Sequence, residues 1–189
     1  MVNVNDSKNI NKPRALILGA GAIGGFYGQA LAIGGADVSV VCRSEYDIVK
    51  ESGYQILSKT RGDTNFKPSQ VLKTASDYQG GPPDYLIVTL KITKGVDRVA
   101  LMRSVVGPAT VIVLIENGVE IEQEIQAAFP NNEIISCLAF IQVSRLSPGV
   151  IRHFAYGDLT IGNFPSGVTT ACKKLSEMLE AAEVKAPAT

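Results

Sequence analysis

Three glycines spaced as G-x-G-x-x-G, namely Gly19, Gly21 and Gly24, follow directly after the apolar run "RALIL". This combination predicts a buried strand that ends in a tight turn, from which a helix begins. The first glycine permits the turn, the second lets phosphates approach the backbone, and the third lets the helix pack on the strand. The segment 14–24 therefore restricts the chain to folds built around a strand–turn–helix unit.

The residues after the turn complete a βαβ unit. The stretch "AIGGFYGQALAI" (22–33) has helical spacing, Gly34 and Gly35 are typical of a C-terminal cap, and 36–42 predicts the second strand. The free N–H groups and the positive dipole end of such a helix face a dinucleotide pyrophosphate. We therefore expect the pyrophosphate to lie on Gly19, Ala20, Gly21, Ala22, Ile23 and Gly24. A glycine-rich turn without a ligand is the alternative.

Strands and helices continue to alternate along the chain. The sequence predicts strands at 84–90, 110–116, 132–143, 149–156 and 159–164, and helices at 95–105, 120–129 and 168–182. Two further short strands, "YQILS" and "KPSQVLK", are expected within 53–80. This order is typical of a doubly wound, mostly parallel α/β sheet of Rossmann-like type. The last two strands are expected as an antiparallel addition at the sheet edge, near the C-terminal end.

Arg43 stands at the end of the second expected strand, beside the adenosine ribose in a fold of this type. A carboxylate at that position binds the 2′-OH of NAD and repels a 2′-phosphate. A guanidinium instead binds the phosphate through charge-assisted hydrogen bonds, and the hydroxyl of Ser44 could add another. The sequence therefore favours NADP over NAD. Glu45 opposes this preference, and a solvated surface arginine is the alternative.

Two polar positions follow strands further along the chain. Lys91 comes after Leu90 at the end of "YLIVTLK", and Asn117 precedes Gly118 at the end of "TVIVLIEN". Ligands of doubly wound folds bind beyond the carboxyl ends of the strands, so both positions are candidates for a substrate site. The alternatives are a solvated lysine and an Asn-Gly turn.

The composition limits the partners. The chain of 189 residues has 18 basic and 18 acidic residues, so it lacks the basic surplus that binds nucleic acid or an anionic membrane. Its apolar runs are far shorter than the about 20 residues of a membrane span. Three cysteines without C-x-x-C spacing and a single histidine give no metal-ligand pattern, and they suit a reducing, cytoplasmic location.

The motifs "ILGAGAIGG", "VVCR", "VTLK", "ENGV" and "SPGVIRH…GDLTIG", in this order and spacing, resemble the N-terminal half of the ketopantoate reductases. The resemblance extends over most of 14–185. It implies NADPH-dependent reduction of ketopantoate to pantoate, a step toward pantothenate and coenzyme A. It also implies a pyrophosphate at Gly19, Gly21 and Gly24 and a 2′-phosphate at Arg43. Lys91 and Asn117 are then the catalytic candidates beside nicotinamide and 2-oxoacid, next to Leu90 and Gly118.

The sequence departs from this family in two respects. Glu116 stands before Asn117, where the family more often has an uncharged residue, and we expect it to pair with Lys91 or to shift its pKa. The family also has a second, helical domain with a catalytic lysine, which this chain does not reach. The expected organisation is a disordered tail (1–12), a Rossmann NADP-binding domain (13–167), and a helix with a connection toward that domain (168–189).

The resemblance leaves three matters open. The substrate could be another 2-oxoacid or ketone, because the residues that select it would lie mainly in the second domain. The chain could also be a non-catalytic NADP-binding module, although Lys91 and Asn117 would then have no purpose. Oligomerisation is possible, since the face that the second domain covers could be apolar.

We predict that the chain by itself binds NADPH but turns over ketopantoate poorly or not at all. Half of a cleft neither excludes water nor holds the substrate in line with the hydride donor. NADPH binding by calorimetry and NADPH consumption in the presence of ketopantoate measure the two properties. Turnover comparable to that of a two-domain reductase would contradict this prediction.

Overall fold

The computed structural model describes residues 12–91, 95–116, 118 and 121–189, so the predicted tail 1–12 lies almost wholly outside the described residues. A nine-stranded sheet forms the centre of this part of the chain, with the strand order β4-β3-β9-β8-β7-β6-β1-β2-β5. The strands are β1 (Arg14–Leu18), β2 (Asp37–Val41), β3 (Tyr54–Ser58), β4 (Thr64–Phe66), β5 (Val71–Leu72), β6 (Tyr85–Val88), β7 (Val111–Leu114), β8 (Ile134–Ser147) and β9 (Val150–Phe164). The helices are α1 (Ala22–Ile33), α2 (Tyr46–Ser52), η1 (Ala75–Asp77), α3 (Arg98–Arg103), α4 (Ile121–Ala128) and α5 (Thr170–Ala181).

The predicted fold class is confirmed. The strands β5, β2, β1, β6, β7 and β8 pair in parallel, as do β3 and β9, and within the described residues antiparallel pairing is confined to β8 with β9 and β3 with β4. The predicted helix at 95–105 is shorter than expected and covers only Arg98–Arg103. It begins where the Asp97 carboxylate accepts a hydrogen bond from the Ala100 N–H at 2.9 Å, as an N-cap does.

Each central strand is buried on both faces. In β1, Ala15 and Ile17 belong to the apolar cluster that includes α1 and α5, whereas Leu16 and Leu18 belong to the cluster of α3 and α4. Successive side chains of a strand point to opposite faces, so an apolar run without alternation fits a sheet covered on both sides. The core therefore has two halves, separated by the sheet.

The strands expected at 149–156 and 159–164 are one continuous strand, and this part of the prediction is wrong. In β9, Tyr156 and Gly157 have positive φ angles, and the pairing with β8 shifts by one residue there. Such a bulge bends a strand without ending it, so a glycine that resembles a turn in the sequence lies inside β9. A side chain at Gly157 would approach the Phe26 ring to 3.1 Å.

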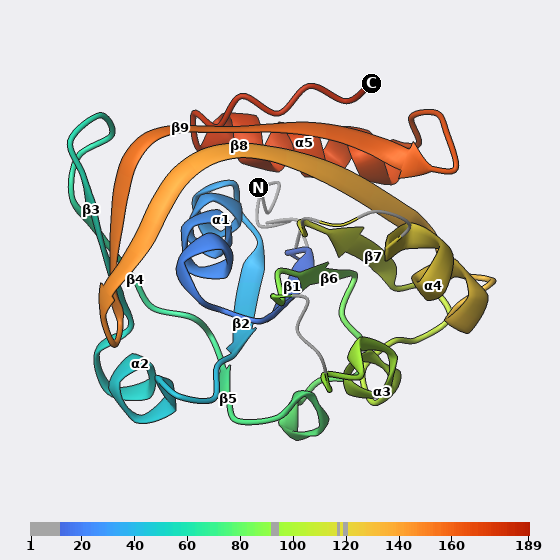
Figure 1. The fold of residues 1–189 in the computed structure, drawn as a ribbon, viewed down its shortest axis with the longest axis horizontal. Coiled ribbons are helices and arrows are strands. Elements are labelled where there is room, and N and C mark those ends of the chain that lie inside the picture. Colours follow the sequence, from blue (N-terminus) through green and yellow to red (C-terminus); the bar gives the residue numbers. More distant parts are fainter. Residues whose placement is uncertain (1–11, 92–94, 117, 119–120) are drawn as a thin grey trace, which may run out of the picture.

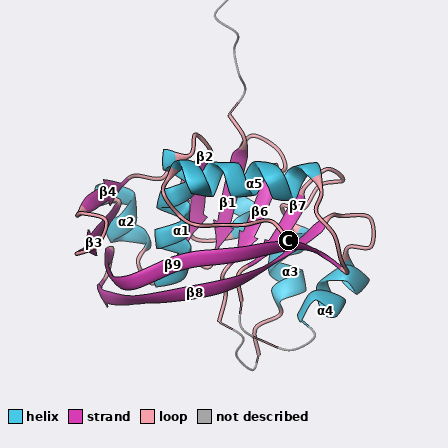
Figure 2. Cartoon of the chain, turned by 90° about the horizontal axis from the view of Figure 1, so that it is seen from above, coloured by secondary structure: helices cyan, strands magenta, loops and turns pink. Residues whose placement is uncertain are grey.

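The strand β9 also does not lie at the sheet edge, because β3 pairs with it in parallel and β4 pairs beyond β3. The expected strand at 67–73 shrinks to β5, and β4 was not expected. β8 pairs with β7 only over Ile134–Ser136 and then continues beyond it. β8 and β9 run side by side and arch over α1 (Figures 1 and 2).

Buried polar contacts connect the arch to the rest of the molecule. The Ser58 hydroxyl and the Nδ1 atom of His153 are 2.8 Å apart and join β3 to β9, while the Nε2 atom of His153 lies 2.9 Å from the Tyr156 carbonyl. The Tyr27 hydroxyl of α1 donates to the Gly157 carbonyl at 3.2 Å. His153 and Tyr27 are thus buried structural residues of the arch, and burial raises the pKa of the Tyr27 phenol.

The predicted final helix is confirmed as α5, with Leu175, Met178, Leu179 and Ala182 buried. It packs against α1, and the chain then runs back along β9. There the amides of Leu159 and Ile161 donate to the carbonyls of Lys185 and Pro187. This last segment belongs to the same apolar cluster as α1.

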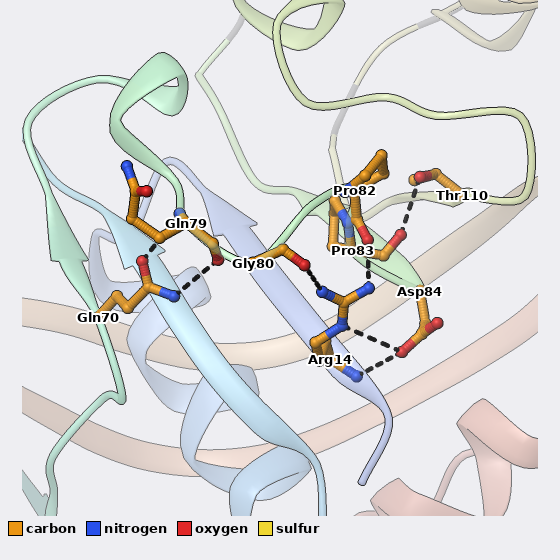
Figure 3. Close-up of polar contacts among 8 residues, drawn as sticks. All are labelled: Arg14, Gln70, Gln79, Gly80, Pro82, Pro83, Asp84 and Thr110. Carbon is orange, nitrogen blue, oxygen red and sulfur yellow. Dashed lines mark hydrogen bonds and ion pairs between the residues drawn. The ribbon is translucent and has the colours of Figure 1, made fainter. Parts of the chain in front are cut away.

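The amino ends of the strands are tied together by the loop before β6 (Figure 3). Arg14 at the start of β1 donates to the carbonyls of Gly80 and Pro82, and its backbone N–H donates to the Asp84 carboxylate at 2.8 Å. The Thr110 hydroxyl donates to the Pro83 carbonyl at 2.8 Å. These contacts fix the edge of the sheet that is opposite to the glycine turn.

We predict that Gly34→Ala destabilises the fold by about 3 kcal/mol, on the scale of overpacking in a core. A Cβ atom at Gly34 would lie 2.0 Å from the Met178 carbonyl oxygen, so α1 and α5 would have to separate. The control is Gly62→Ala, where φ is +79° but a Cβ atom meets no described atom within 4 Å. Its expected cost is about 1 kcal/mol of backbone strain. Urea unfolding of both variants measures the difference, and equal losses would contradict the assigned helix contact.

Candidate functional site

The glycine turn lies between β1 and α1, at the carboxyl edge of the sheet. Gly19 has a φ angle of +98°, which favours glycine. A Cβ atom there would lie 2.8 Å from Leu90 Cδ2 and 3.0 Å from the Leu90 backbone nitrogen. Gly19 is therefore required both by its backbone conformation and by the close approach of the chain that follows β6.

Two hydroxyl groups hold the carbonyls of this turn. Thr89 Oγ1 donates to the Gly19 carbonyl at 2.7 Å, and the Tyr54 phenol of β3 donates to the Ala20 carbonyl at 2.7 Å. The N–H of Ala20 donates to the Val41 carbonyl at the end of β2. The turn is thus fixed from three strands before any ligand binds.

The start of α1 offers hydrogen-bond donors to a ligand. The first i to i−4 bond of the helix runs from the Gly25 N–H to the Gly21 carbonyl, so the amides of Ala22, Ile23 and Gly24 precede the helical ladder. Donors in this position, together with the positive end of the helix dipole, bind phosphate groups.

The second and third glycines differ in their surroundings. A Cβ atom at Gly21 meets no described atom within 4 Å, so the space above this residue is open to a ligand. A Cβ atom at Gly24 would lie 2.7 Å from Thr89 Oγ1 and 2.9 Å from Ile17 Cγ2. The geometry therefore fits the different roles expected for the two glycines: phosphates can approach the backbone at Gly21, and Gly24 packs closely on the sheet.

Arg43 and Ser44 are exposed directly after β2, on the side of the turn where Ala20 is bonded to Val41. Glu45 is buried and points away from solvent. Its carboxylate accepts hydrogen bonds from the Gly149 N–H at 2.7 Å and from Arg145 Nη1 at 2.6 Å. In the sequence analysis, the negative charge of Glu45 argues against a bound 2′-phosphate. In the structure, Arg145 and the Gly149 amide of the hairpin between β8 and β9 neutralise this charge.

Leu90 and Lys91 follow β6 on the other side of the turn, where Leu90 is half-buried against Gly19 and Lys91 is exposed. β1 lies between β2 and β6, and the strand order reverses there. This reversal is the place where doubly wound folds bind their ligands.

The expected contact of Glu116 with Lys91 is corrected by the structure. Glu116 follows β7, its side chain is fully buried, and its carboxylate pairs with Arg98 Nη1 at 2.7 Å. The second Arg98 nitrogen pairs with Glu124 of α4. Burial raises the pKa of Glu116, and Arg98 acts in the opposite direction. Arg98 therefore joins Glu116, at the carboxyl end of β7, to Glu124 of α4, and Glu116 pairs with Arg98 instead of Lys91.

The structure brings most of the predicted site residues to one edge of the sheet. Arg43, the glycine turn and Lys91 follow the neighbouring strands β2, β1 and β6, and the exposed Gly118 follows β7. Asn117, a predicted catalytic residue, lies outside the described residues. Sequence analysis missed the supporting hydroxyls of Tyr54 and Thr89. Thr89 stands inside the motif "VTLK" and could have been found, whereas Tyr54 reaches the turn only through the tertiary fold.

A separate hollow of about 290 Å³ lies between α1, the β3–β4 hairpin and the end of α5. Phe26, Gln29 and Arg61 line it, and it contains none of the predicted site residues. The candidate site is therefore an open edge that is separate from this hollow. Among the helices of the described residues, none has the length and apolar character needed to cross a bilayer.

The parallel sheet, the turn with open amides and the cation beyond β2 define a dinucleotide-binding protein of Rossmann-like type. The family model described as ketopantoate reductase PanE/ApbA matches residues 15–166, and the chain belongs to this family. The family has a dehydrogenase-type fold and uses a nicotinamide cofactor.

Individual relatives agree with this assignment. A 2-dehydropantoate 2-reductase of Nostoc sp. is 32% identical over 159 residues, which are 84% of this chain and 49% of that protein. The crystal structure of 2-dehydropantoate 2-reductase from Methylococcus capsulatus has a TM-score of 0.89 and 48% identity, over 93% of this chain and 56% of that one. The Geobacter metallireducens structure of the same name has a TM-score of 0.84 and 29% identity, over 93% and 57%. The chain thus spans about half the length of the curated relatives it matches.

We predict opposite effects of alanine at two glycines of the turn. Gly21→Ala leaves the melting temperature within about 2 °C of the wild type, since a single compatible surface substitution is nearly neutral, but it weakens dinucleotide binding at least about tenfold. Gly24→Ala lowers stability by about 2 kcal/mol, because its Cβ atom meets Thr89, Gly19 and Ile17. Thermal unfolding and calorimetric titration measure both properties. Loss of stability in Gly21→Ala, or unchanged binding there, would argue against an open cradle.

Proposed function

We propose that this chain is the NADP(H)-binding part of a reductase that converts a 2-oxoacid, ketopantoate by preference, into the 2-hydroxyacid. The observation that carries the proposal is the exposed Arg43 directly after β2, beside a glycine turn whose carbonyls are already satisfied. A guanidinium there complements a 2′-phosphate, and NAD lacks this group.

The environment of Glu45 supports the choice of NADP. A free carboxylate two residues after Arg43 would repel a phosphate dianion. Here the carboxylate is 4% exposed and accepts hydrogen bonds from both Arg145 and the Gly149 amide. The guanidinium of Arg43 therefore faces solvent without a competing anion from Glu45.

The reduced nicotinamide, when bound, supplies a hydride to the substrate carbonyl. Negative charge then develops on the carbonyl oxygen, and a cation placed in advance stabilises it. Lys91 is exposed at the carboxyl end of β6, next to Leu90 and the glycine turn, and it is our candidate for this charge. Asn117 is our second candidate, as a hydrogen-bond partner of the nicotinamide or the substrate.

The preference for ketopantoate rests on the relatives named 2-dehydropantoate 2-reductase and on the matched family model. The proposal includes a role in the synthesis of pantothenate and a cytoplasmic location, for which the low cysteine content is the argument. The general acid and the groups that select the substrate would come from outside this chain.

The experiment that tests the cofactor assignment is calorimetric titration of Arg43→Ala with NADPH and NADH. We predict that NADPH binding weakens by about 1.5–3 kcal/mol, the scale of a hydrogen bond to a charged group, while NADH binding stays nearly unchanged. The control is Arg103→Ala, which removes the same charge from an exposed position at the end of α3. An equal loss for both cofactors, or no preference of the wild type for NADPH, would refute the assignment.

A further inference from the structure

Lys73 is the first residue after β5, and the structure places it next to the end of β2. The two strands pair in parallel with Val41 opposite Leu72, and the Cys42 N–H donates to the Leu72 carbonyl at 2.9 Å. Parallel strands lie about 4.8 Å apart, and their carboxyl ends meet at the same edge. Lys73 directly follows Leu72 and Arg43 comes two residues after Val41, so both residues leave these paired strands at the same edge of the sheet, where the 2′-phosphate site is proposed.

The side chain of Lys73 is held by an aromatic ring. Its ammonium nitrogen lies 4.6 Å from the centroid of the Tyr46 ring, within the range of a cation–π contact. Tyr46 begins α2, three residues after Arg43, and α2 packs against β5 (Figure 1). The ring thus keeps the Lys73 ammonium on the side of β5 that faces the loop 43–46.

The charges around this position are mainly positive. Lys50 of α2 lies 5.1 Å from the same ring and donates to the Tyr46 hydroxyl at 2.8 Å. Among the acids nearby in sequence, Glu45 is paired with Arg145 and Asp77 accepts from the Thr74 N–H at 3.2 Å, while Asp47 is exposed in the first turn of α2. None of the ion pairs among the described residues includes Arg43 or Lys73.

From this juxtaposition we infer that Lys73 is a second cation of the 2′-phosphate site and a determinant of the preference for NADPH over NADH. The inference rests on the proposed function and adds to it a residue that the sequence motif does not contain. A phosphate monoester carries between one and two negative charges near pH 7, so one guanidinium leaves charge that a second cation neutralises. An ammonium placed beforehand by a ring loses less side-chain entropy when it binds.

The test is calorimetric titration of Lys73→Gln with NADPH and NADH. We expect NADPH binding to weaken about five- to tenfold, the scale of an exposed charge-assisted contact, and NADH binding to change less than about twofold. The matched control is Lys67→Gln, which removes the same charge from an exposed lysine near the opposite end of β5. This control is expected to change neither affinity by more than about twofold.

Two variants of Tyr46 test how Lys73 is placed. Tyr46→Phe keeps the ring under the Lys73 ammonium and removes only the hydroxyl that contacts Lys50, so we expect NADPH affinity to be retained. Tyr46→Leu removes the ring, and we expect part of the Lys73→Gln loss, about two- to fourfold, without an effect on NADH. Thermal unfolding of each variant shows whether the fold is preserved.

The outcomes separate this inference from the proposed function. If Arg43→Ala loses the preference for NADPH and Lys73→Gln keeps it, the role of Lys73 is refuted while the cofactor assignment stands. A specific contact of Lys73 with the 2′-phosphate is also refuted if Lys73→Gln weakens the binding of NADPH and NADH equally. The same holds if Lys67→Gln weakens NADPH binding as much as Lys73→Gln does. If the wild type binds NADPH no better than NADH, both ideas fall together.

Discussion

The structure depends on how closely α1 and the glycine that ends it pack against the sheet and against α5. Gly24 brings the helix onto β1 and β6, Gly25 onto Ile151 of β9, and Gly34 onto α5. The backbone can come this near only where a Cβ atom is missing. The same approach brings the start of the helix down onto the sheet edge and aims its amides across the turn. A helix held further away would leave the sheet intact and the phosphate cradle without its donors.

The site divides its support between near and distant parts of the chain. The turn and Arg43 come from one βαβ unit, whereas Tyr54, Thr89 and Arg145 reach it from β3, from β6 and from the tip of the β8–β9 hairpin. Each of these three makes a hydrogen bond to a carbonyl or a carboxylate, which leaves amides and a guanidinium free to face a ligand. This arrangement supports the proposed binding of a phosphate at this edge of the sheet.

The sequence was sufficient for the fold class, because glycine spacing and apolar runs are local signals. It was also sufficient for the positions of Gly19, Arg43 and Lys91 at one edge, since the carboxyl ends of parallel strands meet there. It misled at Gly157, where a bulge and a turn have the same local signature. It also misled about the partners of Glu45 and Glu116. Tertiary packing pairs Glu45 with Arg145, which is distant in the sequence, and Glu116 with Arg98 of α3.

The contact between Glu45 and the hairpin has a thermodynamic consequence. The Glu45 carboxylate of the loop 43–45 also accepts a hydrogen bond from the Gly149 amide, so the order of this loop and the closure of the hairpin depend on one group. On the proposed function, a ligand that orders residues 43–45 favours the closed hairpin at equilibrium, and a more stable hairpin raises the affinity for that ligand by the same factor. The same proposal couples nucleotide affinity to the far end of an arch made of two long strands.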